Sequence, residues 1–191
     1  MHELIRNRWS ARGYDPQATI SEDSLIAILE AGRWAPTWGS VQPVRVIVGT
    51  RGDETFDGLV TALTRGNASW APAAAALILV CTRVLEDDEK ASTYAVFDAG
   101  LATSQMILQA NAEGFNAHPM AGFEIDTVVE TFSIPAEQAP IALIAVGKLA
   151  PRETLDPSIA ERDDRERTRL PLSETAFAGS WGMPYRPDSP A

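Results

Sequence analysis

Arginine side chains occur at alternate positions in two segments of an otherwise acidic chain. Near the N-terminus, Arg8, Ser10 and Arg12 follow one another at every second residue. Arg167 and Arg169 repeat this spacing far downstream. Alternate residues of an extended segment point the same way, so each group can converge on one oxyanion, and guanidinium groups bind phosphate with charge-assisted hydrogen bonds. Two such groups favour a phosphate site over the alternative that the arginines are simply solvated.

Two connecting segments have residues suited to lining a ligand. Residues 35–43 mix hydroxyl groups, an amide and the indole of Trp38, and they lead into a predicted strand. Residues 119–123 form a second turn, where Gly122 permits a close approach of the backbone to a ligand. Taken alone, each segment is an ordinary loop and does not identify the ligand.

Residues that support other chemistries are scarce. The chain has neither a Gly-x-Gly-x-x-Gly turn after a strand nor a Walker phosphate loop. With only two histidines, His2 and His118, the chain has few candidates for a histidine-based metal site or a Ser-His-Asp triad. We expect His118 to be structural or to line a site. The single cysteine, Cys81, lies in an apolar run and is predicted to be a small buried side chain. We therefore assign no catalytic residue and no metal site, and expect a bound cofactor to supply any demanding chemistry.

Length and charge narrow the class of protein. The chain has 191 residues, of which 45% are hydrophobic, which suits one domain with a real core. A formal net charge of -10 disfavours nucleic acid and anionic membranes as partners. The N-terminus lacks an apolar signal core, and no stretch approaches about 18 uninterrupted apolar residues. We expect a cytoplasmic protein that does not enter a membrane.

Apolar spacing and turn residues predict five helices and four strands. The predicted helices span residues 3–7, 22–35, 55–63, 94–113 and 126–132, and the predicted strands span residues 44–48, 74–81, 115–118 and 141–146. Ser21 and Asp126 are suited to cap their helices, Gly66 to stop the third helix, and Phe97 to lie on the apolar side of the fourth. The nearly all-apolar strand 74–81 indicates burial on both faces. The predicted helices and strands alternate unevenly along the chain, which favours a three-layer sandwich around one sheet over a regular doubly wound domain.

The chain changes character after residue 150. Residues 156–169 are highly charged, and residues 180–191 contain several prolines and aromatic side chains. We expect this tail to have little apolar surface of its own and to wrap over another surface, such as a partner subunit. The prediction is a core domain at residues 1–150 and a C-terminal extension of the same domain at residues 151–191.

The order of the short motifs along the chain resembles the nitroreductase family of FMN enzymes. The motifs are Arg8-Trp9-Ser10-x-Arg12, Arg33-Trp34-Ala35-Pro36-Thr37, Gln42-Pro43, Met120-Ala121-Gly122-Phe123 and Arg167-x-Arg169-x-Pro171-Leu172. No single motif is specific, but the ordered set spans nearly the whole chain. The resemblance implies an α+β fold, a three-layer α/β/α sandwich around one mixed, mainly antiparallel sheet, and an intertwined homodimer with FMN at the interface. It implies an oxidoreductase that transfers a hydride from NAD(P)H through FMN to a small electron-poor acceptor, such as a nitroaromatic or a quinone.

The resemblance also implies a role for each matched position. Arg8, Ser10 and Arg12 match the motif that holds the FMN phosphate and the pyrimidine edge of the ring, and the pair Arg167 and Arg169 completes the phosphate site. Residues 36–40 match a loop that the other subunit lays over the flavin, and residues 121–122 match a turn beside the central ring. The implied FMN-binding residues are Arg8, Trp9, Ser10, Arg12, Pro36, Thr37, Trp38, Ser40, Asn67, Met120, Ala121, Gly122, Arg167 and Arg169.

Three positions depart from the family pattern and leave the substrate open. Many members have Asn at the position of Ser40 and an aromatic residue at Val44, and some have an acidic residue at Ala121. Specialised members of the family dehalogenate tyrosines, oxidise peptide-derived rings or consume their own flavin, and these activities remain alternatives. A non-catalytic flavin-binding protein and an interaction domain with solvated arginines are further alternatives.

Overall fold

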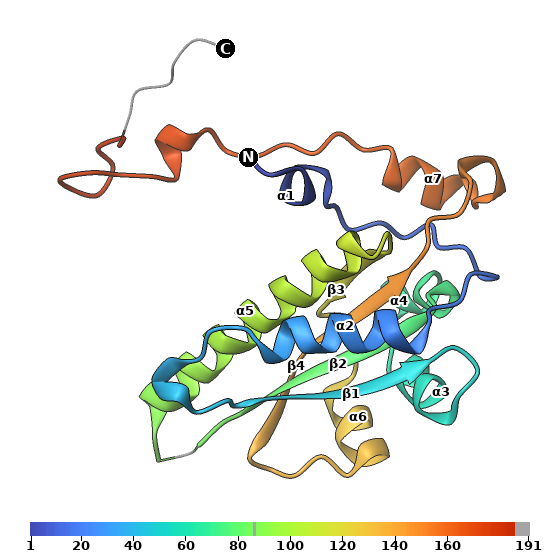
Figure 1. Ribbon diagram of the computed structural model, residues 1–191, viewed down its shortest axis with the longest axis horizontal. Helices are drawn as coiled ribbons and strands as arrows, with labels where there is room; N and C mark the ends of the chain where they lie inside the picture. Colours follow the sequence, from blue (N-terminus) through green and yellow to red (C-terminus); the bar gives the residue numbers. More distant parts are fainter. Residues whose placement is uncertain (86, 186–191) are drawn as a thin grey trace.

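A four-stranded antiparallel sheet forms the middle layer of the protein. The computed structural model describes residues 1–85 and 87–185. The strands are β1 (Val44–Thr50), β2 (Ala76–Arg83), β3 (Asn116–Met120) and β4 (Gln138–Gly147), and their order across the sheet is β1-β2-β4-β3 (Figure 1). All three strand pairings in the described residues are antiparallel, so the parallel pairing implied by a mixed sheet is not found there.

Helices cover both faces of this sheet, as the predicted three-layer sandwich requires. The α-helices of the described residues are α1 (Glu3–Asn7), α2 (Glu22–Arg33), α3 (Glu54–Thr61), α4 (Arg65–Ala68), α5 (Glu89–Ala112), α6 (Ile125–Phe132) and α7 (Pro157–Asp163). Helices α2 and α5 pack together over one face, while α3 and α6 cover the other (Figure 1).

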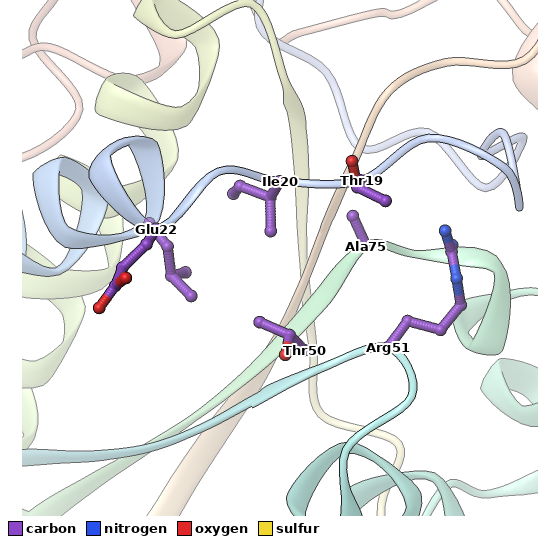
Figure 2. Close-up of a pocket in the computed structure, with 7 residues that line it drawn as sticks. Thr19, Ile20, Glu22, Thr50, Arg51 and Ala75 are labelled. Carbon is purple, nitrogen blue, oxygen red and sulfur yellow. The ribbon is translucent and has the colours of Figure 1, made fainter.

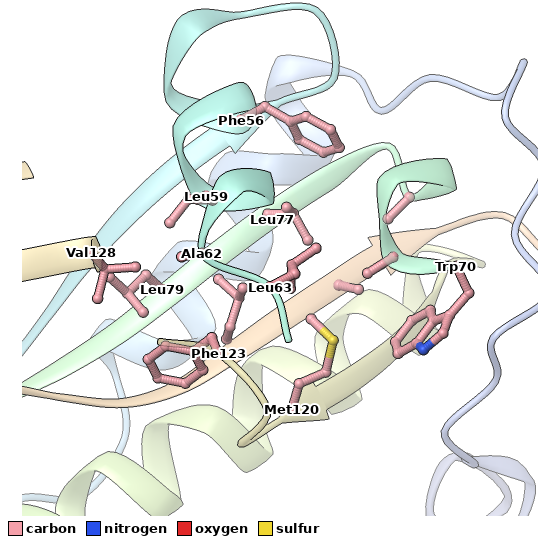
Figure 3. Close-up of a cluster of buried hydrophobic side chains, with 14 of the residues drawn as sticks. Phe56, Leu59, Ala62, Leu63, Trp70, Leu77, Leu79, Met120, Phe123 and Val128 are labelled. Atoms are coloured by element: carbon pink, nitrogen blue, oxygen red, sulfur yellow. The ribbon is translucent and has the colours of Figure 1, made fainter. Parts of the chain in front are cut away.

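Strand β2 supplies side chains to both halves of the core. Leu77 and Leu79 point into the cluster under α3 and α6, whereas Ile78 and Val80 point into the cluster under α2 and α5. Figure 3 shows the first cluster, with Trp70 at one end and Val128 at the other. All four β2 side chains are fully buried, which confirms the prediction made from the all-apolar run.

Several predicted element ends are wrong for local reasons. Helix α5 begins at Glu89 rather than at residue 94, because the Asp88 carboxylate accepts the Ala91 N–H and caps an earlier start. Gly66 lies inside α4 and does not stop α3, which ends at Thr61. Helix α6 begins one residue before Asp126, which therefore lies in the first turn and is not the cap.

The predicted apolar side of α5 is wrong at Phe97 and right at Ile107, which is buried. Phe97 is 60% exposed, although its spacing suggested a core position. The buried side of the helix carries Met106 and Ile107 together with small residues such as Ala99 and Ala102, which let α2 and the sheet approach closely. Large apolar side chains thus remain on the outer side of α5.

The segment after residue 150 begins in the body of the protein and then leaves it. Helix α7 was not predicted, although Asp156 caps it and Pro157 occupies its first turn, two recognisable start signals. Residues 164–185 run past α1 and then away from the sandwich (Figure 1); the predicted extension also includes residues 186–191, which lie outside the described residues. Contrary to expectation, the segment exposes large apolar side chains, namely Leu170, Leu172, Trp181, Met183 and Tyr185.

No helix in the described part of the chain is both long and apolar enough to span a membrane.

Candidate functional site

Side chains of strand β3 hydrogen-bond to the backbone of the N-terminal arginine motif. The Asn116 amide accepts a hydrogen bond from the Ala11 N–H at 3.3 Å and donates one to the Trp9 carbonyl at 3.1 Å. Two residues on, His118 Nδ1 lies 2.7 Å from the Ala11 carbonyl oxygen, so this nitrogen carries the proton and donates it. Sequence reasoning missed Asn116, because an amide on a strand carries no local signal for a partner 105 residues away.

Three arginines form a basic cluster, here defined as Arg8, Arg167 and Arg169. Burial lowers the pKa of Arg8, and the charges of Arg167 and Arg169 lower it further. Arg167 also donates to the Arg8 carbonyl at 2.6 Å and thereby ties the C-terminal segment to the N-terminal motif. The Ser10 hydroxyl accepts a hydrogen bond from Arg8 at 3.3 Å. The structure therefore brings together the two arginine segments that the sequence separates.

No carboxylate of the described residues forms an ion pair with the basic cluster. The two ion pairs found among them join Arg33 to Glu30 and Arg152 to Asp164. The acceptors that these guanidinium groups find among the described residues are uncharged carbonyl and hydroxyl oxygens. A phosphate group, with three acceptor oxygens and nearly two negative charges, has the chemistry that these guanidinium groups would bind.

Arg12 does not join the basic cluster, which corrects the prediction that all three N-terminal side chains converge on one anion. Its guanidinium lies over the Trp70 ring, 5.6 Å from the ring centroid. Its Nε is buried and has no hydrogen-bond partner among the described residues. A buried donor without an acceptor costs about 1–3 kcal/mol, so Arg12 is positioned for an acceptor that a ligand would bring.

A polar junction links α4 to the turn after β3. The Gly122 carbonyl accepts hydrogen bonds from Asn67 Nδ2 at 2.9 Å and from Thr64 Oγ1 at 3.0 Å. A Cβ at Gly122 would lie within 2.7 Å of both donor atoms, so only glycine fits without displacing them. Asn67 and the turn, which the sequence placed in one site by resemblance alone, are thus in direct contact.

The surroundings of Met120 and Trp9 differ from those of the basic cluster. The Met120 side chain is only 4% exposed and lies in the core cluster of Figure 3, so only its backbone is available to a ligand. Trp9 lines a small cavity with Gly13 and Asp163 on the side of α7. Ala121, in contrast, is exposed at the end of β3.

Helix α5 holds the loop formed by residues 36–42, which contains Pro36, Thr37, Trp38 and Ser40. The buried Asp98 carboxylate accepts the Trp38 N–H, with N–O distances of 2.9 and 3.1 Å. Ser40 and Gln42 have φ angles of 61° and 41°, which L-residues adopt at a cost of about 1–3 kcal/mol each. This loop is therefore held in its conformation by tertiary contacts.

The loop and the arginine motif lie near opposite ends of α5. Asp98 contacts the loop, whereas Asn116, just beyond the end of the helix, contacts the N-terminal motif. The helix from Asp98 to Ala112 rises about 20 Å at about 1.5 Å per residue. In one chain these two groups of predicted site residues are thus held at different points along α5.

A separate cavity of about 480 Å³ lies between the segment before α2 and the end of β1 (Figure 2). Its lining includes Thr19, Ile20, Thr50 and Arg51, none of which was predicted to bind a ligand. The Arg51 guanidinium donates to the carbonyls of Ala18, Ala73 and Ala74, so it fastens main chain segments together. Among the described residues, no group of three or more His, Cys, Asp and Glu side chains is placed to hold a metal ion.

Comparison with known proteins gives one consistent family. A sequence model described as the Nitroreductase family matches residues 5–64 and 50–148. An uncharacterized 15.4 kDa protein of Mycolicibacterium smegmatis is 46% identical over 149 residues, which cover 74% of this chain and 99% of that protein. YdgI of Bacillus subtilis, whose name proposes an NAD(P)H nitroreductase, is 27% identical over 183 residues, covering 78% of this chain and 88% of YdgI.

Solved structures agree with the sequence relatives. A crystal structure described as an oxidoreductase containing FMN has a TM-score of 0.86 and 33% identity, and covers 95% of this chain and 92% of that chain. A nitroreductase family protein from Clostridium difficile 630 has a TM-score of 0.74 and 29% identity, and covers 94% of this chain and 99% of that chain. Both share the α+β sandwich over almost their full length.

The neutral state of His118 generates a prediction about pH. Burial lowers its pKa below the usual 6.5; the hydrogen bond to the Ala11 carbonyl opposes this shift, while Arg12 and Arg162 add to it and Asp163 opposes it least. The unfolded chain therefore binds a proton at His118 more readily than the folded chain does. The contribution of His118 to the free energy of unfolding is constant above about pH 6.5 and falls below it.

Urea unfolding from about pH 7.5 down to about pH 5 should show a shallower loss of unfolding free energy for His118→Gln than for the wild type. His2→Gln, at an exposed position, is the matched control and should follow the wild type. Equal slopes for wild type and His118→Gln would show that His118 is not held neutral by the fold.

Proposed function

The chain belongs to the nitroreductase family, and from this premise we propose that it is an FMN-dependent oxidoreductase. It would use NAD(P)H to reduce a small electron-poor acceptor, with nitroaromatics and quinones as the first candidates. The single observation that carries the proposal is the basic cluster, whose charges repel one another and lack an ion-pair partner in the described residues. An FMN phosphate supplies the missing negative charge.

Residues of one subunit would hold most of the cofactor. Arg8, Arg167 and Arg169 would bind the phosphate, and the unpartnered Nε of Arg12 would donate to an acceptor atom at the pyrimidine edge of the ring. A cation at that edge favours negative charge on the ring. When bound, FMN would supply the two-electron chemistry that the side chains of this protein cannot perform.

The turn after β3 would lie beside the ring. Asn67 and Thr64 hold the Gly122 carbonyl, which fixes the backbone of residues 121–122 relative to α4. A backbone N–H donor at this turn is present whatever the side chain is. Ala121 can therefore replace the acidic residue of other family members without loss of this donor. The departure bears on which acceptor binds, rather than on the binding of FMN.

We propose that a second copy of the chain completes each site. The different attachment points of the two groups support this arrangement, since Asp98 lies about 20 Å along α5 from its end at Ala112, and loop 36–42 of the partner could then cover the flavin. The outer side of α5 supports it too, since Val96 and Phe97 are 44% and 60% exposed beside Gly100, whose missing side chain allows close approach. The apolar side chains of residues 164–185 would then be buried on the partner.

Three buried or half-buried side chains that carry protons, Cys81, Tyr14 and His118, are unsuited to acid–base catalysis here. Burial raises the pKa of the Cys81 thiol to about 11, and burial with the nearby Asp163 charge raises the pKa of Tyr14. His118 uses Nδ1–H to hold the Ala11 carbonyl. These observations support a mechanism in which the chain binds and orients the reactants, while solvent supplies protons.

An anaerobic absorbance spectrum of the purified protein tests the function directly. We expect a flavin spectrum that bleaches promptly with NADPH or NADH and returns when a quinone is added. A bound flavin that stays oxidised with both donors would favour a specialised or non-catalytic member of the family. Absence of flavin, even after incubation with FMN, would overturn the proposal.

Removing a member of the basic cluster should weaken FMN binding without unfolding the protein. For Arg8→Ala we expect the FMN dissociation constant to rise about tenfold, less than a fully buried charge-assisted bond would give, because Arg8 is only half-buried. Arg169→Ala, at an exposed position, should have a smaller effect in the same direction. Fluorescence titration of the apoprotein with FMN measures both.

Arg83→Ala is the matched control, because it removes the same charge from an exposed position at the end of β2. Unchanged FMN affinity in both Arg8→Ala and Arg169→Ala would show that the phosphate binds elsewhere.

A charge on the outer side of α5 should disrupt the dimer. Phe97→Glu would bury an uncompensated carboxylate in the proposed interface, and we expect the dimer dissociation constant to rise at least about thirtyfold. Sedimentation equilibrium measures the change, with Ala136→Glu, on an exposed loop, as the control. A Phe97→Glu protein that remains as dimeric as the control would place the interface on another surface.

A further inference from the structure

Asp98 is a buried carboxylate that the proposed mechanism does not use. Its side chain is on α5, and the residue is only 2% exposed. Both carboxylate oxygens lie within hydrogen-bond distance of the Trp38 N–H, at 2.9 and 3.1 Å. A buried charge is retained only where it is hydrogen-bonded, so the contact with the Trp38 backbone is a strong constraint on this loop.

Trp38 is held a second time through its ring. The indole stacks on Tyr94, one helical turn before Asp98, with centroids 5.2 Å apart and an interplanar angle of 9°. The Lys90 ammonium, one turn earlier again, lies 5.8 Å from the centroid of the Trp38 ring. Residues at this spacing share one face of a helix, so a single face of α5 fixes both the backbone and the ring of Trp38.

The rest of the loop would not hold Trp38 in place without these contacts. Gly39, Ser40 and Gln42 all have positive φ angles, and the last two lack the freedom of glycine. Even so, Trp38 remains 38% exposed, so part of its aromatic surface is available to a ligand. The loop thus presents a flat, oriented and partly open ring.

We propose that Trp38 is the wall that selects planar acceptors, and that Asp98 and Tyr94 are positioning residues that set its orientation. The proposal rests on the proposed function, because it places the Trp38 of one subunit over the flavin of the other. A planar acceptor would lie between the flavin and the edge or face of the indole, where aromatic contacts strengthen its binding. Lys90 beside the ring also favours acceptors that carry a negative charge or an electron-rich oxygen.

Binding of two molecules that the flavin cannot reduce tests the proposal without relying on turnover. Benzoate and cyclohexanecarboxylate have the same charge and similar size, but only benzoate is planar and aromatic. Calorimetric titration of the oxidised FMN-loaded protein measures the ratio of their dissociation constants. We expect the wild type to bind benzoate about fivefold more tightly, the magnitude of one aromatic contact.

Two pairs of variants separate positioning from folding. Asp98→Ala and Tyr94→Leu should reduce the preference for benzoate at least about threefold, while Asp98→Asn, which keeps an acceptor for the Trp38 N–H, and Tyr94→Phe, which keeps the ring, should retain it. Tyr94 is 39% exposed, so Tyr94→Leu remains informative if Asp98→Ala fails to fold.

The outcomes distinguish this proposal from the proposed function. A wild type without a preference for benzoate would overturn the role of Trp38, and a preference that persists in both Asp98→Ala and Tyr94→Leu would overturn the positioning roles, in each case leaving the flavin enzyme intact. A wild type that does not bind FMN or whose flavin is not reduced would instead overturn the proposed function. Loss of the preference in Asp98→Ala and its retention in Asp98→Asn would support the role of Asp98, and the same contrast between Tyr94→Leu and Tyr94→Phe would support the role of Tyr94.

Discussion

Burial of both faces of β2 constrains where every other element of this protein can lie. Leu77 and Leu79 require an apolar layer on one face, and Ile78 and Val80 require a second layer on the other. Helices α3 and α6 meet the first requirement and α2 and α5 the second, so the sandwich follows from one strand that has no polar side. The strand also fixes β4 and, through it, β3, whose residues hold the N-terminal motif.

Electrostatics in the site oppose the charge of the whole molecule. A chain with a net charge of -10 keeps three arginines together, and the charges of two of them lower the pKa of Arg8. An anion bound there would relieve this repulsion, which in the free chain is met by solvent and by backbone carbonyls. The buried and unpartnered Nε of Arg12 leads to the same conclusion from hydrogen bonding.

Helix α5 has two functions that its sequence alone would not distinguish. Its small residues pack against α2 and the sheet, which leaves Phe97 and Val96 on the outer side. Near its N-terminal end it holds loop 36–42 through Asp98, while its C-terminal end leads into the strand that holds the arginine motif. Its length therefore separates two groups of site residues, and this separation is the physical reason for proposing a site shared between two chains.

The sequence alone determined the types of most elements, the double burial of the strand at 74–81 and the ordered motifs of the family, because these depend on local periodicity and composition. It also located Asn67 and Gly122, but only by resemblance. Tertiary structure decided that Arg12 leaves its neighbours for Trp70, that Asn116 and His118 hold the motif, and that Asp98 holds Trp38. Each of these contacts joins residues at least 58 positions apart, where spacing along the chain carries no information about distance in space.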